Sequence, residues 1–386
     1  MHRSLAVTIV LAACGGSSSS SPDAALVDSD PGADSALGDA PVIDAPVDDA
    51  AVVDAPLVPQ PVVCGGETCP VDQTCEQGTC RAEACVGASV PGDYATIQSA
   101  VTALAAAGND ATICLSTQAY AASYIELDDP GNHGKALRIV GAGMDRSKIT
   151  THFYVGDGWS SVSFEHLEIT STSGFAIYHT EDINPDVSVI ASRLRGFEGI
   201  RAYEQANVLV SASIIDVAGY GLDLYHSAAS TGPTAVRIED SYLTGAGGGA
   251  IRSNNAGAVG KITISVLGST FRGNDIAISL EGKTTATIAS SIFTGITQLA
   301  LTWTATDVVT HANNALWGNV TNYGGVAVDG AGYVKTDCLL TQTSPVPGLG
   351  ASSPCRNAGD ATHATQTDFY GVPRSSPPDI GPVEAP

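Results

Sequence analysis

The amino-acid sequence predicts an all-β protein whose main part is a parallel β-helix, a solenoid of stacked coils. A unit of roughly 20 to 28 residues recurs between about Ser160 and Gly332. Each unit contains an alternating apolar strand, a small polar residue, a bulky apolar residue, a glycine-rich break and a second alternating strand. Such units are too short for propeller blades and lack the periodicity of helical repeats, whereas one coil of a parallel β-helix fits them.

The register of the coils can be read from columns of equivalent residues. The small polar column holds Ser192, Ser213, Ser241, Ser269, Ser291 and Asn314, and the apolar column two residues later holds Leu194, Ile215, Leu243, Phe271, Phe293 and Leu316. Alternating pairs from the second strand continue the apolar pattern as far as Val326 and Val328. Period-two alternation places the apolar residues on one face, so we expect them to point inward. The polar column is expected at a turn, where short side chains bond to neighbouring backbone.

Three other stretches give the chain a resemblance to a family. The stretch DYATIQSAVTALAAAGNDATICL from Asp93 to Leu115 resembles the helix that precedes the first coil in proteins of the pectin-lyase-like superfamily. GKALRIVGAG from Gly134 to Gly143 resembles their early strand and turn, and the ending SSPCRNAGD with TDFYGVPRSSPPDIGPVE is similar to that of choice-of-anchor Q proteins. The resemblance implies a single-stranded right-handed parallel β-helix with an N-terminal capping helix. It implies no single activity, because this fold carries lyases, hydrolases, esterases and binding proteins.

The charge balance narrows the range of partners. The chain has 386 residues, a formal net charge of −23, and 17 Lys and Arg against 40 Asp and Glu. Nucleic acid is excluded as an expected partner, since phosphate binding requires a basic surface. Anionic membrane surfaces are not expected to attract the chain by charge either.

Residues 1–13 read as an export signal with a basic start, a short apolar run and small residues before Cys14. The stretch Leu11-Ala12-Ala13-Cys14-Gly15 is similar to the lipobox of bacterial lipoproteins. That similarity implies cleavage before Cys14, a lipid on its sulfur, and a site on the outer membrane or cell surface of a Gram-negative bacterium. The alternative is an ordinary secretory signal that contains a cysteine.

Residues 14–63 form a predicted disordered tether rich in serine, proline and alanine. Its aspartates recur at a regular spacing, at Asp23, Asp28, Asp34, Asp39, Asp44, Asp49 and Asp54. A chain of this composition buries too little apolar surface to fold, and proline with self-repelling charge extends it. It is expected either to hold the β-helix away from the membrane or to be an inert leader.

Residues 64–85 form a predicted small module rich in cysteine. Apart from Cys14, eight cysteines remain, an even number in an exported chain, so disulfides are expected. Zinc is the less favoured alternative, because the cluster has no CxxC pair and no nearby histidine. The expected pairs are Cys85 with Cys114, Cys338 with Cys355, and two bridges among Cys64, Cys69, Cys75 and Cys80. The β-helix is expected over residues 86–359, and residues 360–386 are expected to wrap the last coil as a cap.

A candidate site lies where three consecutive coils can be aligned on tyrosine. The predicted patch comprises Tyr178, Tyr203 and Tyr225 in one column, Arg201 and Asp223 two positions earlier, and His179, Glu204 and His226 one position later. If the intervening apolar residues point inward, these side chains should gather on the outer face of coils about 4.8 Å apart. Three interpretations remain open, namely a stabilising stack without a ligand, a sugar-binding surface and a catalytic site.

Catalysis would use specific members of this patch. A β-elimination needs a base, for which Tyr225 or His226 qualifies, and a cation such as Arg201 to neutralise the acid group of the substrate. Hydrolysis would instead need two carboxylates about 5 to 9.5 Å apart, such as Glu204 and Asp223. The stretches typical of polygalacturonases and pectate lyases are missing from the sequence. Glu181, Asp182 and Asp186 form an acidic loop that is a weak Ca²⁺ candidate, and no other cofactor is expected.

The sequence therefore predicts a lipid-anchored surface protein that binds polysaccharide or acts as an adhesin. The alternative is a polysaccharide-processing enzyme, a lyase rather than a hydrolase. The coils beside the tyrosine column have only short insertions in the sequence, the longest from Thr180 to Asp186, and this favours binding on an open face.

Overall fold

The computed structural model describes strand residues at 63–64, 67–68, 74–76 and 79–81, and residues 85–385 apart from 132–133, 180–184, 204, 227–231, 256–261 and 342–344. Residues Leu57–Pro386 form one compact unit, to which the following description is confined. The expected signal peptide, Cys14 and the expected tether as far as residue 62 lie outside the described residues, so the expectations about them remain predictions; Val63, the last residue of the expected tether, is already part of a strand.

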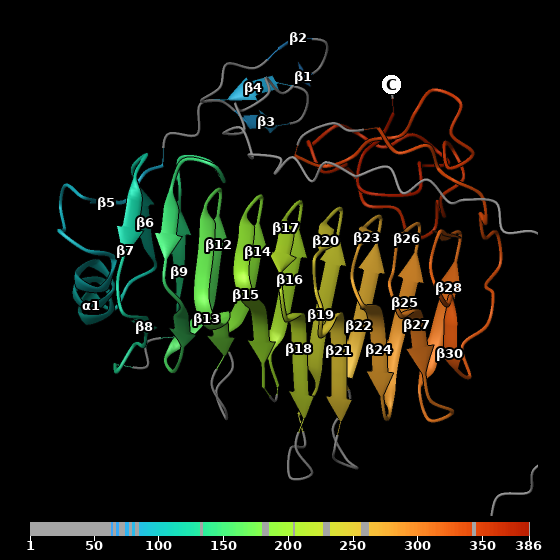
Figure 1. The fold of residues 1–386 in the computed structure, drawn as a ribbon. Helices are drawn as coiled ribbons and strands as arrows, with labels where there is room; N and C mark the ends of the chain where they lie inside the picture. The colour runs from blue at the N-terminus through green and yellow to red at the C-terminus, as the bar shows by residue number, and fades with distance from the viewer. Residues whose placement is uncertain are drawn as a thin grey trace, which may run out of the picture. The chain divides into compact units, whose positions relative to one another are not determined.

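Parallel strands stack into a right-handed β-helix, as the sequence predicts (Figure 1). One wall is a ten-stranded parallel sheet with neighbouring strands from successive coils. Its strands are β5 (Ala88–Val90), β6 (Ala111–Leu115), β9 (Lys135–Val140), β12 (Trp159–Glu165), β14 (Asp186–Ile190), β16 (Asn207–Ser211), β19 (Thr234–Glu239), β22 (Ile262–Leu267), β25 (Thr284–Ala289) and β28 (Val308–Ala312).

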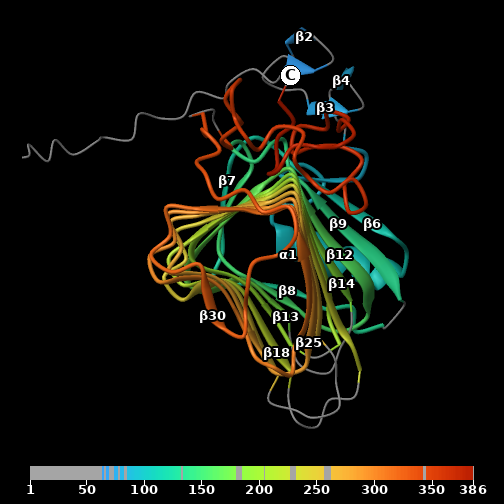
Figure 2. The ribbon, with the colours of Figure 1, turned by 90° about the vertical axis from the view of Figure 1, so that its right-hand side faces the viewer.

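The other walls belong to a 16-stranded sheet that bends around a corner and so forms two rows. The first row holds β7 (Ala119–Ala121), β10 (Lys148–Thr150), β13 (Glu168–His179), β15 (Arg193–Ala202), β17 (Ile214–Val217), β20 (Tyr242–Thr244), β23 (Thr270–Arg272), β26 (Ile292–Thr294) and β29 (Ala315–Trp317). The second row holds β8 (Ile125–Leu127), β11 (Phe153–Val155), the ends of β13 and β15, β18 (Tyr220–His226), β21 (Gly249–Asn255), β24 (Ile276–Glu281), β27 (Leu299–Trp303) and β30 (Tyr323–Gly325). Figure 2 shows the coils superimposed along the stacking direction.

The predicted polar column forms a hydrogen-bonded ladder at the corner that follows the ten-stranded sheet. We call Ser192, Ser213, Ser241, Ser269, Ser291 and Asn314 the serine ladder, and all six are fully buried. The backbone N–H of each serine donates to the side-chain oxygen of the next member, at 3.1 Å from Ser192 to Ser213 and 2.9 Å from Ser291 to Asn314. The expectation of a turn column bonded to backbone is confirmed.

The residue before each ladder position adopts the left-handed conformation that lets the chain turn. The φ angles are 46° at Ala191, 47° at Ala212, 48° at Asp240, 53° at Ser290 and 52° at Asn313. Residues other than glycine are destabilised in this conformation. The hydrogen bonds of the buried serine ladder, which lie next to these residues, offset that cost. The corner is therefore repeated in nearly the same geometry in successive coils.

The apolar column fills the interior as predicted. Leu194, Leu243, Phe271 and Phe293 are fully buried, and the rings of the two phenylalanines stack with centroids 4.9 Å apart. The expectation is wrong for Val326 and Val328, which are 51% and 63% exposed. The last strand ends at Gly325, before both valines. Strand alternation therefore does not apply to them and does not place their side chains in the core.

The N-terminal end of the β-helix is covered by α1 (Ile97–Ala107), the expected capping helix. The Thr96 side chain accepts from the N–H of Ser99 at its start, and Gly108 ends it at φ 65°. Its buried face includes Ile97, Val101 and Ala105. Of the helices in the described part of the chain, none is long and apolar enough to cross a membrane.

Both disulfides expected outside the cysteine cluster are present, Cys85–Cys114 and Cys338–Cys355. Within the cluster, β1 (Val63–Cys64) pairs antiparallel with β2 (Glu67–Thr68), and β3 (Thr74–Glu76) with β4 (Thr79–Arg81). The β3–β4 register sets Cys75 opposite Cys80 in the backbone. The side-chain pairing among Cys64, Cys69, Cys75 and Cys80 lies outside the described residues.

The C-terminal segment runs along the side of the coils. Regular strands end with β30, and residues up to Val334 add only single bridges. Beyond the Cys338–Cys355 disulfide, the buried Arg374 forms an ion pair with Asp240, in the turn after β19. The N–H of Gly381 donates to the Ser290 carbonyl, in the turn after β25. The segment thus crosses the turns of several coils (Figure 1), where the sequence had suggested a wrap around the last one.

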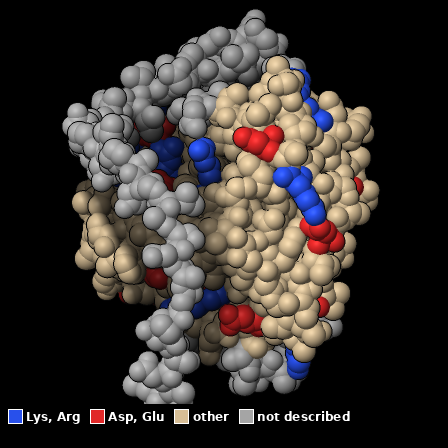
Figure 3. All heavy atoms as spheres, turned by 45° about the vertical axis from the view of Figure 1, so that its right-hand side comes forward, with Lys and Arg blue, Asp and Glu red and all other residues tan. Residues whose placement is uncertain are grey.

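Charged side chains are sparse on the face shown in Figure 3, where most of the visible described surface is neutral. A neutral flank is what alternation in this sequence produces, because the outward positions of the coils are often Ser, Thr, Asn or Tyr. Local groupings of charge therefore stand out against this background.

We predict that Ser241→Ala lowers the free energy of unfolding by about 1–3 kcal/mol. The Oγ of Ser241 accepts from the buried N–H of Ser213 and donates to the Glu239 carbonyl at 2.7 Å, so its removal leaves a buried donor unpaired. Urea denaturation measures the change. Thr285→Ala on the exposed face of β25 is the control and should change little. Equal effects in the two variants would show that the ladder bonds add nothing to stability.

Candidate functional site

A row of aromatic rings runs across successive coils on the outer face of the second row of strands. We call Tyr124, Tyr154, Tyr178, Tyr203 and Tyr225 the tyrosine strip. Its consecutive ring centroids are 5.7, 5.4, 5.6 and 5.5 Å apart. Tyr124 is 46% exposed and the other four are half-buried, so each ring offers part of its surface to solvent. The three predicted tyrosines thus belong to a longer row.

The position of each ring follows from strand alternation. Val155, Ile177 and Leu224 are fully buried beside the tyrosines, because they point into the core and their neighbours point out. The sequence missed Tyr124 and Tyr154, which precede the stretch where the repeat was recognised. The signal that could have found Tyr154 is the alternation in Phe153–Val155, with two fully buried residues around the tyrosine.

The predicted register is correct for one pair of coils and wrong for the other. Arg201 pairs with Asp223, which aligns Tyr203 with Tyr225 as expected. Tyr178 pairs with Arg201 and not with the Tyr203 position, a displacement of two residues. The cause is an irregularity in β13, where the register shifts between Ser171 and Phe175. The rings of Tyr178 and Tyr203 still meet, since diagonal neighbours are within reach of long side chains.

The two histidines do not belong to the outer face, which corrects the prediction. His179 and His226 follow outward tyrosines, so they point inward and are 1% and 0% exposed. The Nε2 atom of His226 lies 2.8 Å from the Gly232 carbonyl oxygen. Neither ring can act as a base for a ligand on the strip. Glu204 lies outside the described residues, so its expected place in the patch remains a prediction.

Beside the strip, two arginines share one carboxylate, and we call Arg201, Asp223 and Arg252 the arginine bridge. Arg201 donates from Nε and Nη2 to Oδ2 of Asp223 at 3.0 and 2.7 Å, and Arg252 donates from Nε to Oδ1 at 2.9 Å. Asp223 is 1% exposed, while the arginine side chains are 30% and 28% exposed. This carboxylate is therefore engaged on both oxygens, so it is not available as the catalytic partner of Glu204 that the sequence suggested.

Aromatic rings and a second carboxylate surround the arginine bridge. The guanidinium of Arg201 lies 4.6 Å from the ring centroid of Phe175, and that of Arg252 lies 3.9 Å from that of Tyr220. Burial raises the pKa of the Glu198 carboxyl, the charge on Arg201 and Arg252 opposes the rise, and Asp223 adds to it. The arginine bridge alone carries one net positive charge, on a chain that is strongly acidic overall.

The described residues give no support to a metal centre. They contain no group of three or more His, Cys, Asp or Glu side chains close enough to hold an ion. Asp186 is exposed and accepts a hydrogen bond from Asn207 at 2.8 Å, whereas Glu181 and Asp182 lie outside the described residues. The suggestion of a Ca²⁺ loop at these three residues therefore stays a prediction.

Strand pairing defines the class of protein, a right-handed parallel β-helix. No family model matches the chain, and no curated protein matches it either. Among solved structures, it is similar to the crystal structure of pectate lyase Pel9A, with a TM-score of 0.38 and 15% sequence identity over 78% of this chain and 96% of that chain. The similarity concerns the chain path, so the function has to be argued from the site itself.

We predict that Asp223→Ala lowers the free energy of unfolding by about 2–4 kcal/mol, because two facing guanidinium groups lose their common partner. The value is below that of a fully buried pair since water screens the partly exposed arginines. Asp216→Ala is the matched control. Its ion pair with Arg195 is 3.4 Å long, and both side chains are more than 40% exposed, so it is a surface ion pair. Asp216→Ala should cost less than about 1 kcal/mol. Chemical denaturation of both variants would contradict the prediction if Asp216→Ala were the more damaging.

Proposed function

We propose that this protein binds a linear polysaccharide along the tyrosine strip. The observation that carries the proposal is the continuous row of five partly exposed rings at centroid spacings of 5.4 to 5.7 Å. Tyrosine rings offer apolar faces to the C–H faces of sugars and a hydroxyl for hydrogen bonding. A row of rings at regular spacing suits a ligand that itself repeats, and so favours a polymer over a small molecule.

Features beside the strip support binding to a glycan that carries carboxylate groups. Arg201 donates to Asp223 from Nε and Nη2, so its Nη1 group takes no part in that ion pair. The Arg201 side chain is 30% exposed. A guanidinium that is already oriented by a carboxylate and an aromatic ring loses little freedom when it binds an acidic sugar. The strip would then supply most of the contact area and the arginine bridge the charge selectivity.

A polysaccharide lyase is the second candidate function, favoured by the position of Tyr225 and Arg201 on one face. In a β-elimination, Arg201 would neutralise the substrate carboxylate, and Tyr225 or the less acidic Glu198 would take the proton next to it. Binding is the better-supported role because His226 is buried and Asp223 is fully paired. The partly exposed rings also form a row on a sheet face.

We predict that Tyr203→Ala weakens polysaccharide binding about ten-fold, the equivalent of roughly 1–2 kcal/mol for one lost stacking contact. Tyr203 touches Tyr178 and Tyr225, so it lies inside the row. Affinity electrophoresis against neutral and acidic polysaccharides gives the measurement, and ultraviolet absorbance of the same mixtures reports any unsaturated products. Val308→Ala removes an exposed apolar side chain elsewhere and should leave binding unchanged. If the parent protein binds none of the polymers, the strip is a structural stack only.

We also propose that the chain is anchored in a membrane through a lipid on Cys14, on the support of the Leu-Ala-Ala-Cys-Gly stretch. The proline- and aspartate-rich tether would then hold the β-helix at a distance from the membrane.

We predict that Cys14→Ser moves the protein from the membrane fraction to the soluble fraction, or leaves it with its signal peptide uncleaved. The reason is that several acyl chains hold a protein durably, whereas the acidic chain itself has no attraction for anionic lipid. Fractionation with immunoblotting and the intact mass of the mature protein measure both results. A variant that stays in the membrane and is processed normally would contradict the lipid anchor.

A further inference from the structure

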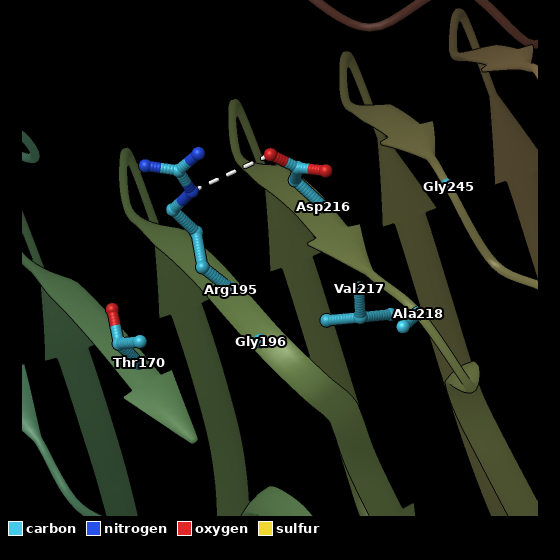
Figure 4. A pocket seen from close by; sticks show the side chains of 7 residues that line it. All are labelled: Thr170, Arg195, Gly196, Asp216, Val217, Ala218 and Gly245. Atoms are coloured by element: carbon cyan, nitrogen blue, oxygen red, sulfur yellow. Dashed lines mark ion pairs between the residues drawn. The ribbon is translucent and has the colours of Figure 1, made fainter. Parts of the chain in front are cut away.

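A groove of about 490 Å³ lies on the first row of strands (Figure 4), whereas the tyrosine strip follows the second row. It is lined by Thr170, Arg195, Gly196, Asp216, Val217, Ala218 and Gly245. These residues come from equivalent places in β13, β15, β17 and the turns that follow β17 and β20. The groove therefore crosses successive coils and is open to solvent.

The polar side of the groove is a loosely associated pair of opposite charges. The Nε atom of Arg195 lies 3.4 Å from Oδ2 of Asp216, and the two side chains are 44% and 41% exposed. Figure 4 shows both side chains rising from neighbouring strands on the same side. In the arginine bridge the corresponding contact is 2.7 Å and the carboxylate is buried. The groove pair thus retains donors and acceptors that can turn toward a ligand.

The floor of the groove is apolar and low. Gly196 and Gly245 have φ angles of 106° and 78°, and a Cβ at Gly196 would lie 1.9 Å from the Ser171 carbonyl oxygen. No larger residue fits at Gly196 without a backbone shift, which explains why the floor carries no side chain there. The Ala218 N–H donates to the Gly196 carbonyl, and the Gly247 N–H to the Ala218 carbonyl, each at 2.9 Å. With these polar groups satisfied, the exposed Ala218 presents an apolar surface, whereas the Val217 side chain is 2% exposed and packs in the core.

We propose that this groove is a second saccharide-binding site, which takes one or two sugar units without a net charge. A carboxylate and a guanidinium on one wall can accept from and donate to adjacent sugar hydroxyls, while an apolar floor suits the C–H face of the ring. The sugar is neutral because Arg195 and Asp216 cancel each other's charge, unlike the arginine bridge with its surplus cation. This site does not depend on the tyrosine strip. If one polymer occupies both sites, binding at one site raises the effective concentration of the polymer at the other and so strengthens its overall binding.

The test is calorimetric titration of the full chain with the neutral disaccharides cellobiose, mannobiose and lactose as probes. We expect saturable binding of at least one probe. Ala218→Phe should weaken it at least ten-fold by filling the groove from an exposed position, and Asp216→Asn should weaken it by removing an acceptor. Thr285→Phe adds the same ring on the exposed face of β25 and should have no effect. Thermal melting confirms that each variant is folded.

The titrations of the parent, Ala218→Phe and Thr285→Phe would overturn the proposal in three cases, namely if no probe binds, if Ala218→Phe binds as well as the parent, or if Thr285→Phe weakens binding equally. Tyr203→Ala separates this site from the proposed strip. If it abolishes disaccharide binding, the probe lies on the strip, so the groove is refuted and the strip supported. If it changes only polymer binding, the two sites are distinct. Disaccharide binding without any polymer binding would retain the groove and refute the strip.

Discussion

The structure depends on one constraint, which is that the corners of the coils from Ser192 to Asn314 bury backbone N–H groups whose partners lie in the next coil. At the serine ladder each buried N–H finds its acceptor on the side chain one coil along. An unpaired buried amide would cost about 1–3 kcal/mol at each step. The ladder therefore fixes the register between coils, and the register in turn decides which outward side chains stand in line. The groove is a consequence of that alignment, and so is the position of Tyr203 beside Tyr225 in the tyrosine strip.

The sequence predicts the inside of this protein better than its outside. Core columns and the ladder repeat, so the same residue types recur at the same place and can be aligned by eye. Outward residues have no such repetition, because each needs only to tolerate solvent. The predicted register of Tyr178 is wrong because an irregularity in β13 shifts the pairing with β15 by two residues. The pattern of apolar residues in the sequence does not reveal this shift. The alignment on tyrosine predicts His179 and His226 in the outer patch, but strict alternation from the neighbouring tyrosines places them inside, where the structure has them.

Other residues could not be assigned from the sequence because their role is set by neighbours in different coils. Arg252 is 29 residues from Asp223 in sequence, yet it completes the arginine bridge. Glu198 owes its raised pKa to burial beside that cluster, and its place between Gly196 and Gly199 in the sequence gives no hint of it. The groove is a similar case, since Gly245 and Gly196 become one floor only after the coils are stacked. From the sequence alone, these glycines can be identified only as residues that form turns.

The path of the C-terminal segment has a consequence for how the solenoid comes apart. Stacked coils usually fray from an open end, because each terminal coil touches only one neighbour. Here the polypeptide that follows the last coil is fastened further back, at Asp240 and Ser290. A terminal coil that opened would remain a closed loop between its own stack and these attachments, and a loop gains less disorder than a free tail. We therefore expect the C-terminal segment to make the final coils unfold together, as one cooperative unit.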